Sequence, residues 1–329
     1  MSDPLIIAIP SKGRLKEQVD AWLADCGLPV RTSGGDRGYS AALEGLDDVQ
    51  VRLASAGDIA ASLTLGDVHL GVTGEDLLRE QPADGAERFR LLTPLGFGRA
   101  DLVVAAPKSW IDVETMADVE DVAHLYLART GRRLRVATKY LAQTRAFFAR
   151  HGIVDYRITE SGGATEGAPA AGAAELVVDI TTTGATLAAN GLKILSDGLI
   201  LRSQAHLAAA LGAKWSPGQR AACRRLLSIT SARARGRSTA VLAWPASHDA
   251  AARAALAGPC PEADATGAHG AIIARSRLFD AADALACAGV GPISVTRPEY
   301  LFESSCAAAD GLDEVLAAGA TGVDNHPIS

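Results

Sequence analysis

Short apolar segments that end in polar turns alternate with helical hydrophobic patterns along much of the chain. We expect buried strands at residues 5–10, 68–74, 101–107, 134–138 and 175–180, each followed by a polar turn and a helix. Apolar strands separated by helices are typical of an α/β fold, in which helices cover both faces of a parallel sheet. Ligands of such sheets bind beyond the carboxyl ends of the strands, so the polar turns there are the candidate functional residues.

The sequence after about Ala232 has a different composition. The basic stretch 233–238 is expected to connect the preceding core to a further segment. In that segment we expect strands at 239–244, 271–274 and 293–296 and helices at 247–256 and 278–288. This order suits a small α+β domain that resembles a ferredoxin-like sandwich.

Bulk composition argues against several classes of function. The 329 residues are 48% hydrophobic and 21% charged, as in soluble globular proteins, and the net charge of −6 gives no field that favours nucleic acid. We expect no signal peptide and no membrane segment, because no apolar run approaches about 20 residues. Five widely spaced cysteines favour reduced thiols in the cytoplasm, and the seven histidines lack zinc-binding spacing, so no protein-held metal site is expected.

The turn after the strand at 175–180 combines a carboxylate with a hydroxyl-rich helix start. Asp179 ends the strand, and it is followed by Thr181, Thr182, Thr183, Gly184, Ala185 and Thr186. A helix N-terminus presents unpaired N–H groups, glycine allows a tight turn, and threonine hydroxyls add donors, so this turn suits a monophosphate. Asp179 would repel phosphate and is better placed to accept hydrogen bonds from sugar hydroxyls. The alternative is an ordinary helix cap, in which threonine is common.

This turn resembles the loop that binds phosphoribosyl pyrophosphate (PRPP) in phosphoribosyltransferases. Five further stretches, in the same order along the chain, resemble the ATP phosphoribosyltransferase family, which catalyses the first step of histidine biosynthesis. They are residues 9–15, 67–77, 95–98, 135–140 and 163–169. The resemblance implies that N1 of ATP displaces pyrophosphate from C1 of PRPP, with Mg²⁺ bound mainly through substrate phosphates. Two alternatives are another PRPP-dependent transferase, with a base as nucleophile, and a non-catalytic bilobal binding protein.

The resemblance also implies an architecture and partners. It implies a two-lobed, periplasmic-binding-protein-like (type II) catalytic core, with lobe one at 1–100 and 200–232 and lobe two at 101–199. Residues 233–329 would then be the regulatory domain of the family's long form. Long-form relatives are homohexamers that are inhibited by histidine, so we expect this chain to form a homo-oligomer, a hexamer or a dimer. A separate histidyl-tRNA-synthetase-like regulatory subunit is the alternative.

Lys12 and Arg14 are the candidate catalytic cations at the mouth of the first strand. Negative charge grows on the leaving pyrophosphate, so nearby cations stabilise the transition state more than the ground state. Gly13 between them lets the backbone approach a ligand. The alternative is that both side chains are merely solvated charges.

Five other charged residues are candidate substrate ligands. Lys139 follows a buried strand and could contact a phosphate, and Glu166 lies in a small-residue loop where it could orient a ribose hydroxyl or the adenine amine. Glu75 and Asp76 could help to bind ATP, although capping a helix explains them equally well. Arg99 stands where relatives often have Cys-Arg after a glycine, so it is a candidate for contacting pyrophosphate or the ATP phosphates.

Overall fold

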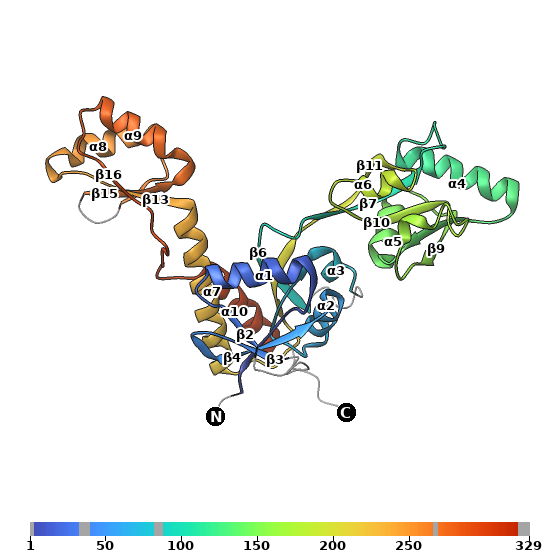
Figure 1. Ribbon diagram of the computed structural model, residues 1–329, viewed down its shortest axis with the longest axis horizontal. Helices are drawn as coiled ribbons and strands as arrows, with labels where there is room; N and C mark the ends of the chain where they lie inside the picture. Colours follow the sequence, from blue (N-terminus) through green and yellow to red (C-terminus); the bar gives the residue numbers. More distant parts are fainter. Residues whose placement is uncertain (1–2, 33–39, 82–87, 266–268, 322–329) are drawn as a thin grey trace.

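A computed structural model describes residues 3–32, 40–81, 88–265 and 269–321. The described chain contains a seven-stranded, a five-stranded and a four-stranded sheet, and each belongs to a separate unit in Figure 1. Within these ranges no helix has both the length and the apolar character needed to cross a membrane.

The first unit, lobe one, is a sheet in the order β2-β3-β4-β1-β5-β12-β6. Its strands are β1 (Leu5–Pro10), β2 (Val30–Thr32), β3 (Ser40–Leu43), β4 (Leu46–Ala54), β5 (Leu70–Gly74), β6 (Phe89–Pro94) and β12 (Ala205–Ala210), and its first helices are α1 (Gly13–Asp25), α2 (Ala56–Leu65) and α3 (Glu75–Arg79). β1 runs parallel to β4 and β5, while β12 lies antiparallel between β5 and β6. Because β1 and β5 are parallel, α1 and α3, which follow them, begin at the same end of the sheet.

The second unit, lobe two, has the order β11-β7-β10-β8-β9. Its elements are β7 (Ala100–Pro107), α4 (Met116–Thr130), β8 (Leu134–Thr138), α5 (Leu141–Arg150), β9 (Tyr156–Glu160), the 3₁₀ turn η2 (Thr165–Gly167), β10 (Leu176–Thr181), α6 (Ala185–Ala189) and β11 (Leu192–Ser203). β7 and β12, the first strands after each crossing between the lobes, are antiparallel to both of their neighbours. This strand order is that of a type II periplasmic-binding-protein-like core, and it confirms the predicted fold.

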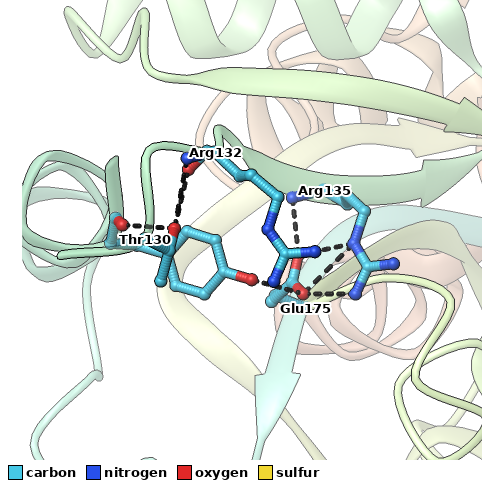
Figure 2. Close-up of polar contacts among 5 residues, drawn as sticks. Thr130, Arg132, Arg135 and Glu175 are labelled. Atoms are coloured by element: carbon cyan, nitrogen blue, oxygen red, sulfur yellow. Dashed lines mark hydrogen bonds and ion pairs between the residues drawn. The ribbon is translucent and has the colours of Figure 1, made fainter. Parts of the chain in front are cut away.

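Hydrogen bonds link β8 and β10 of lobe two at the end of the strands opposite the turn at 181–186, which is predicted to bind phosphate. Glu175, just before β10, accepts hydrogen bonds from the backbone N–H of Arg135 at 2.7 Å, from its guanidinium and from the Tyr126 hydroxyl at 3.2 Å (Figure 2). Burial alone would raise the pKa of Glu175, but these hydrogen bonds outweigh it and the pKa lies below its usual value. Arg135, which begins a family-like stretch, therefore joins β8 to β10 and does not face the ligand edge.

The long helix α7 (Pro217–Ser238) leads from lobe one to the third unit (Figure 1). Ser216 and Gln219 form a capping box at its start, and the expected connector 233–238 is its last part. The third unit consists of β13 (Thr239–Ala243), η3 (Ala246–His248), α8 (Asp249–Leu256), β14 (Asp264–Ala265), β15 (Gly270–Ala274), η4 (Arg275–Arg277), α9 (Leu278–Cys287) and β16 (Ser294–Thr296). Its antiparallel sheet has the order β14-β15-β13-β16, which is ferredoxin-like as predicted.

The chain then returns to lobe one. α10 (Ala307–Thr321) places Ala309, Leu312 and Leu316 in the same buried cluster as the strands of lobe one. Arg224 of α7 ties it down by ion pairs of 2.6 Å to Asp310 and to Asp313. The sequence grouped this helix with the C-terminal regulatory segment, whereas its apolar residues, spaced three and four apart, pack it on the catalytic core.

Candidate active site

The two lobes face each other across a cavity of about 510 Å³. Lobe one contributes Arg14, Gly96 and Phe97 to its wall, and lobe two contributes Ile180 and Thr182. A second cavity of about 410 Å³ adjoins it and is lined by Arg99, Ala100, Asp101, Thr181, Thr182, Arg202, Ser203 and Gln204. Three of these residues also line the first cavity, so both belong to one interlobe cleft.

The predicted phosphate turn lies on this cleft. Gly184 has φ +74°, a left-handed conformation that glycine adopts without strain, and its N–H donates to Thr181 Oγ1 at 2.8 Å. The Thr182 hydroxyl donates to the Arg99 carbonyl at 3.4 Å, which fixes the turn to the crossing segment. Thr183, Ala185 and Thr186 are exposed. Thr183 Oγ1 accepts from the Ala185 N–H at 3.4 Å, so Thr181, Thr182 and Thr183 all contribute hydrogen bonds to the turn.

Three predicted ligand residues gather beside the turn. Asp179 is half-buried, and burial is the main cause of a raised pKa of its carboxyl; nearby Glu166 also raises it. The Ile180 N–H, 2.8 Å from Asp179 Oδ1, and the Lys139 ammonium oppose this rise. Lys139 is exposed, with Nζ 5.0 Å from the centre of the Tyr140 ring. The structure therefore brings two carboxylates and one ammonium together at the carboxyl ends of β8 and β10.

The candidate catalytic cations stand at the start of α1. Lys12 is the N-cap of this helix, and Gly13, its first residue, has φ +79°. Lys12 and Arg14 are both exposed. Arg14 shares the 510 Å³ cavity with Arg99 and Thr182, so the structure brings it to the phosphate turn.

Glu75 and Asp76 already have protein partners. The buried Asp76 carboxylate accepts hydrogen bonds from the Tyr140 hydroxyl at 2.7 Å and the Ser203 hydroxyl at 2.8 Å. Glu75 forms an ion pair with Arg79, at 2.6 Å. Both acids lie in the first turn of α3, and Asp76 also lines the 510 Å³ cavity.

Sequence reasoning missed residues on the returning strand. Thr181, Asp101 and Arg202 are register partners across β10, β7 and β11, so their side chains share one face of the sheet. Arg202 thereby lines the smaller cavity together with Arg99. No motif marks Arg202 in the sequence, because only the strand order brings the end of β11 beside the phosphate turn.

The chain is similar to known proteins along nearly its whole length. Residues 55–228 match the profile of the family described as HisG, ATP phosphoribosyltransferase. The ATP phosphoribosyltransferase of Caulobacter vibrioides (strain NA1000 / CB15N) is 66% identical over 316 residues, which cover 96% of this chain and 99% of that protein. The enzyme of Rhodopseudomonas palustris (strain BisA53) is 57% identical over 71% of this chain and 72% of its own length.

One similar solved structure is the ATP phosphoribosyl transferase (HisG:HisZ) complex from Thermotoga maritima. It is 27% identical, with a TM-score of 0.48, and the match covers 63% of this chain and 87% of that one. The assignment of a family rests on the family profile and on the sequence relatives, one of which matches this chain over 96% of its residues. The chain therefore belongs to the ATP phosphoribosyltransferase family, the enzymes that form phosphoribosyl-ATP and pyrophosphate from ATP and PRPP in the first step of histidine biosynthesis.

Proposed function

We propose that PRPP binds with its 5′-phosphate on the turn at 181–186 and its ribose hydroxyls on Asp179 and Glu166. The observation that carries this proposal is the turn itself, where Thr181 and Thr182 line the cleft, Thr183 and Thr186 are exposed, and the half-buried Asp179 precedes them on β10. The Lys139 ammonium lowers the pKa of Asp179 and so favours the ionised carboxylate, which accepts hydrogen bonds. In this orientation C1 of the ribose points into the cleft toward lobe one.

We further propose that the leaving pyrophosphate and the ATP phosphates lie against lobe one and the crossing strands. Arg14 reaches the larger cavity, Lys12 precedes it, and Arg99 with Arg202 lines the smaller one. These cations face a region in which negative charge increases as the bond to C1 breaks. The protein thus supplies position and electrostatics, and no side chain needs to form a covalent intermediate.

Mg²⁺ is proposed as the cofactor, bound mainly through the substrate phosphates. Within the described ranges no group of three His, Cys, Asp or Glu side chains could hold a metal ion, so substrate oxygens and water would supply most ligands. Asp101 is a carboxylate in the smaller cavity and fits a direct or water-mediated contact. When bound, the ion would neutralise charge on the pyrophosphate. Excess EDTA should stop phosphoribosyl-ATP formation and added Mg²⁺ should restore it; turnover that persists in EDTA contradicts the proposal.

The surroundings of Asp179 predict the pH dependence of PRPP use. The ionised carboxylate binds the ribose, so kcat/KM for PRPP should fall on the acid side at a pH above the ordinary aspartate pKa of about 3.9. Lys139→Met removes a charge that lowers this pKa and should move the acid limb to higher pH. Glu166→Gln removes a charge that raises it and should move the limb to lower pH.

Initial rates measured at on the order of ten pH values from 4.5 to 9 would give the acid limb for the wild type, Lys139→Met and Glu166→Gln. Circular dichroism at each pH checks that the proteins stay folded. Titration of PRPP itself is common to the three proteins and cancels in the comparison. Limbs that coincide would show that Asp179 does not bind the ribose as a carboxylate.

For domain organisation, we propose that residues 1–100 and 200–232 form lobe one together with α10, that 101–199 form lobe two, and that 239–296 are the regulatory unit. We propose that this unit binds histidine and that the enzyme is a homo-oligomer, a hexamer or a dimer. The Caulobacter vibrioides enzyme supports a sensor within the chain, because its match covers 96% of this chain and so extends into the C-terminal unit. The five unpaired thiols support a cytoplasmic site of action.

Excision of 239–296 tests the sensor without damaging the core. Val241 pairs with Thr296, so the cut ends lie close together and a short Gly-Ser link can join Ser238 to Arg297. Truncation after Ala232 would instead remove α10 from the core of lobe one. The excised enzyme should keep its activity and lose inhibition by histidine. The size of the full-length and excised particles, measured with and without histidine, gives the oligomeric state of each. Retained inhibition contradicts the proposal, as does a full-length enzyme that responds to histidine only when a histidyl-tRNA-synthetase-like subunit is added.

A further inference from the structure

The segment 75–80 of lobe one makes a set of hydrogen bonds to lobe two. Glu80 lies just after α3, and its carboxylate accepts from the backbone N–H of Ala142 at 2.7 Å and of Gln143 at 3.3 Å. These N–H groups belong to the second and third residues of α5, whose own N-cap residue, Tyr140, makes no side-chain hydrogen bond to the start of the helix. A carboxylate at this position satisfies orphan N–H groups and the positive end of the helix. The cap of a lobe-two helix is therefore supplied by lobe one.

Asp76 makes a second link beside the first. Its carboxylate binds the hydroxyl of the fully buried Tyr140 in lobe two and that of Ser203 on the returning strand, and its carbonyl accepts from Gln143 Nε2 at 2.8 Å. Burial, and then the Asp76 charge, raise the pKa of Tyr140, so its hydroxyl stays protonated and donates. Leu77 between the two acids packs against the cores of both lobes.

These links end next to the PRPP-binding residues. Tyr140 follows Lys139 directly, and the Lys139 ammonium lies 5.0 Å from the centre of the Tyr140 ring. The same ammonium acts electrostatically on Asp179. On the other side of the links, a cavity of about 510 Å³ separates Leu78 and Phe89 from Ala146 and Ile200. Because packing between the lobes is interrupted there, the hydrogen bonds have a larger share in fixing their relative position.

We infer that Glu80 and Asp76 are positioning residues for the transfer reaction: they clamp Tyr140 and the start of α5 to lobe one and so set Lys139, Asp179 and the bound PRPP at the correct distance from the nucleophile on the opposite lobe. The inference rests on the proposed PRPP site. It assigns to Glu80 no contact with substrate. A displacement of about 1 Å between reacting groups can cost on the order of 100-fold in rate, which is why a contact remote from the chemistry matters.

The test compares Glu80→Ala, Glu80→Gln and Tyr140→Phe in the full-length enzyme, with Glu120→Ala, an exposed acid on α4, as the matched control. Glu80→Ala and Tyr140→Phe should lower kcat by about 10- to 100-fold while the KM for PRPP stays within about 3-fold, because the phosphate turn is untouched. Glutamine keeps a carbonyl oxygen that can accept one of the two N–H bonds, so Glu80→Gln should recover most of kcat. Glu120→Ala should match the wild type.

Melting temperature and far-ultraviolet circular dichroism accompany the kinetics. An unchanged kcat in Glu80→Ala, or a kcat that stays equally low in Glu80→Gln although that variant melts like the wild type, overturns the inference. A loss expressed mainly as a higher KM for PRPP also overturns it. Failure of the proposed PRPP site is a separate outcome. It would be seen as a normal KM for PRPP when Thr183 and Thr186 of the turn are both replaced by valine, whatever the result for the Glu80 variants.

Discussion

Replacing Thr183 and Thr186 together by valine is expected to lower kcat/KM for PRPP by about 100-fold, mainly through a higher KM. Valine has nearly the shape of threonine but no hydroxyl, so each change removes a donor from the proposed 5′-phosphate site. The change at Thr183 also removes its 3.4 Å hydrogen bond from the Ala185 N–H. Thr181 and Thr182, whose hydroxyls hold the turn itself, stay in place. The loss should therefore reflect binding of the phosphate and not collapse of the turn.

Steady-state kinetics with PRPP varied at saturating ATP measure this effect, and Thr130→Val is the matched control. Thr130 is exposed at the end of α4, and its hydroxyl bonds to the carbonyl of Tyr126 at the edge of lobe two opposite the turn (Figure 2). The KM for ATP should change little in both proteins. Equal kcat/KM values for the double variant and the wild type would mean that these threonines only cap α6.

The position of the turn at 181–186, between a strand and a helix at the cleft, could be predicted from the sequence because its signals are local. A buried strand, a carboxylate at its end, a glycine and several hydroxyls follow one another within a dozen or so residues, and short-range rules suffice to interpret them. The same holds for Lys12 and Arg14, which directly follow β1. The ferredoxin-like unit was also predictable, apart from the two-residue strand β14, which is too short to produce a pattern.

Other features depend on contacts between distant segments. β4 is half exposed, with Asp47, Asp48 and Arg52 among its residues, so it lacks the continuous apolar run that marked the other strands. Asp76 was predicted as a ligand because it follows a strand, and only the folded chain shows that the hydroxyl of Tyr140, 64 residues away, donates to its carboxylate. The position of Arg202 follows from strand order, and the attachment of α10 to lobe one follows from packing. Neither can be predicted from local periodicity in the sequence.

Removing the two cations of α1 is the second change with a large expected effect. Lys12→Ala and Arg14→Ala should each lower kcat by about 100-fold, and the double variant by about 1000-fold or more, with smaller changes in either KM. The reason is that charge on the pyrophosphate is greater in the transition state than in bound PRPP, so a cation beside it stabilises the former more. Arg31→Ala is the control, because Arg31 is an exposed arginine that pairs with Glu44 at 2.7 Å and is not part of α1.

Single-turnover rates with both substrates saturating separate chemistry from product release and decide the case. If the cations act on the leaving group, the rate of the chemical step falls in each α1 variant, and raised Mg²⁺ recovers only part of it, since the ion and the side chains occupy different places around the pyrophosphate. If the side chains only attract anionic substrates to the cleft, kcat stays near the wild-type value while the KM for ATP and the KM for PRPP rise together. Added salt then removes the difference in KM between the wild type and the variants. That second pattern would assign Lys12 and Arg14 to substrate capture and leave stabilisation of the leaving pyrophosphate to Arg99 and Arg202, the arginines that line the smaller cavity.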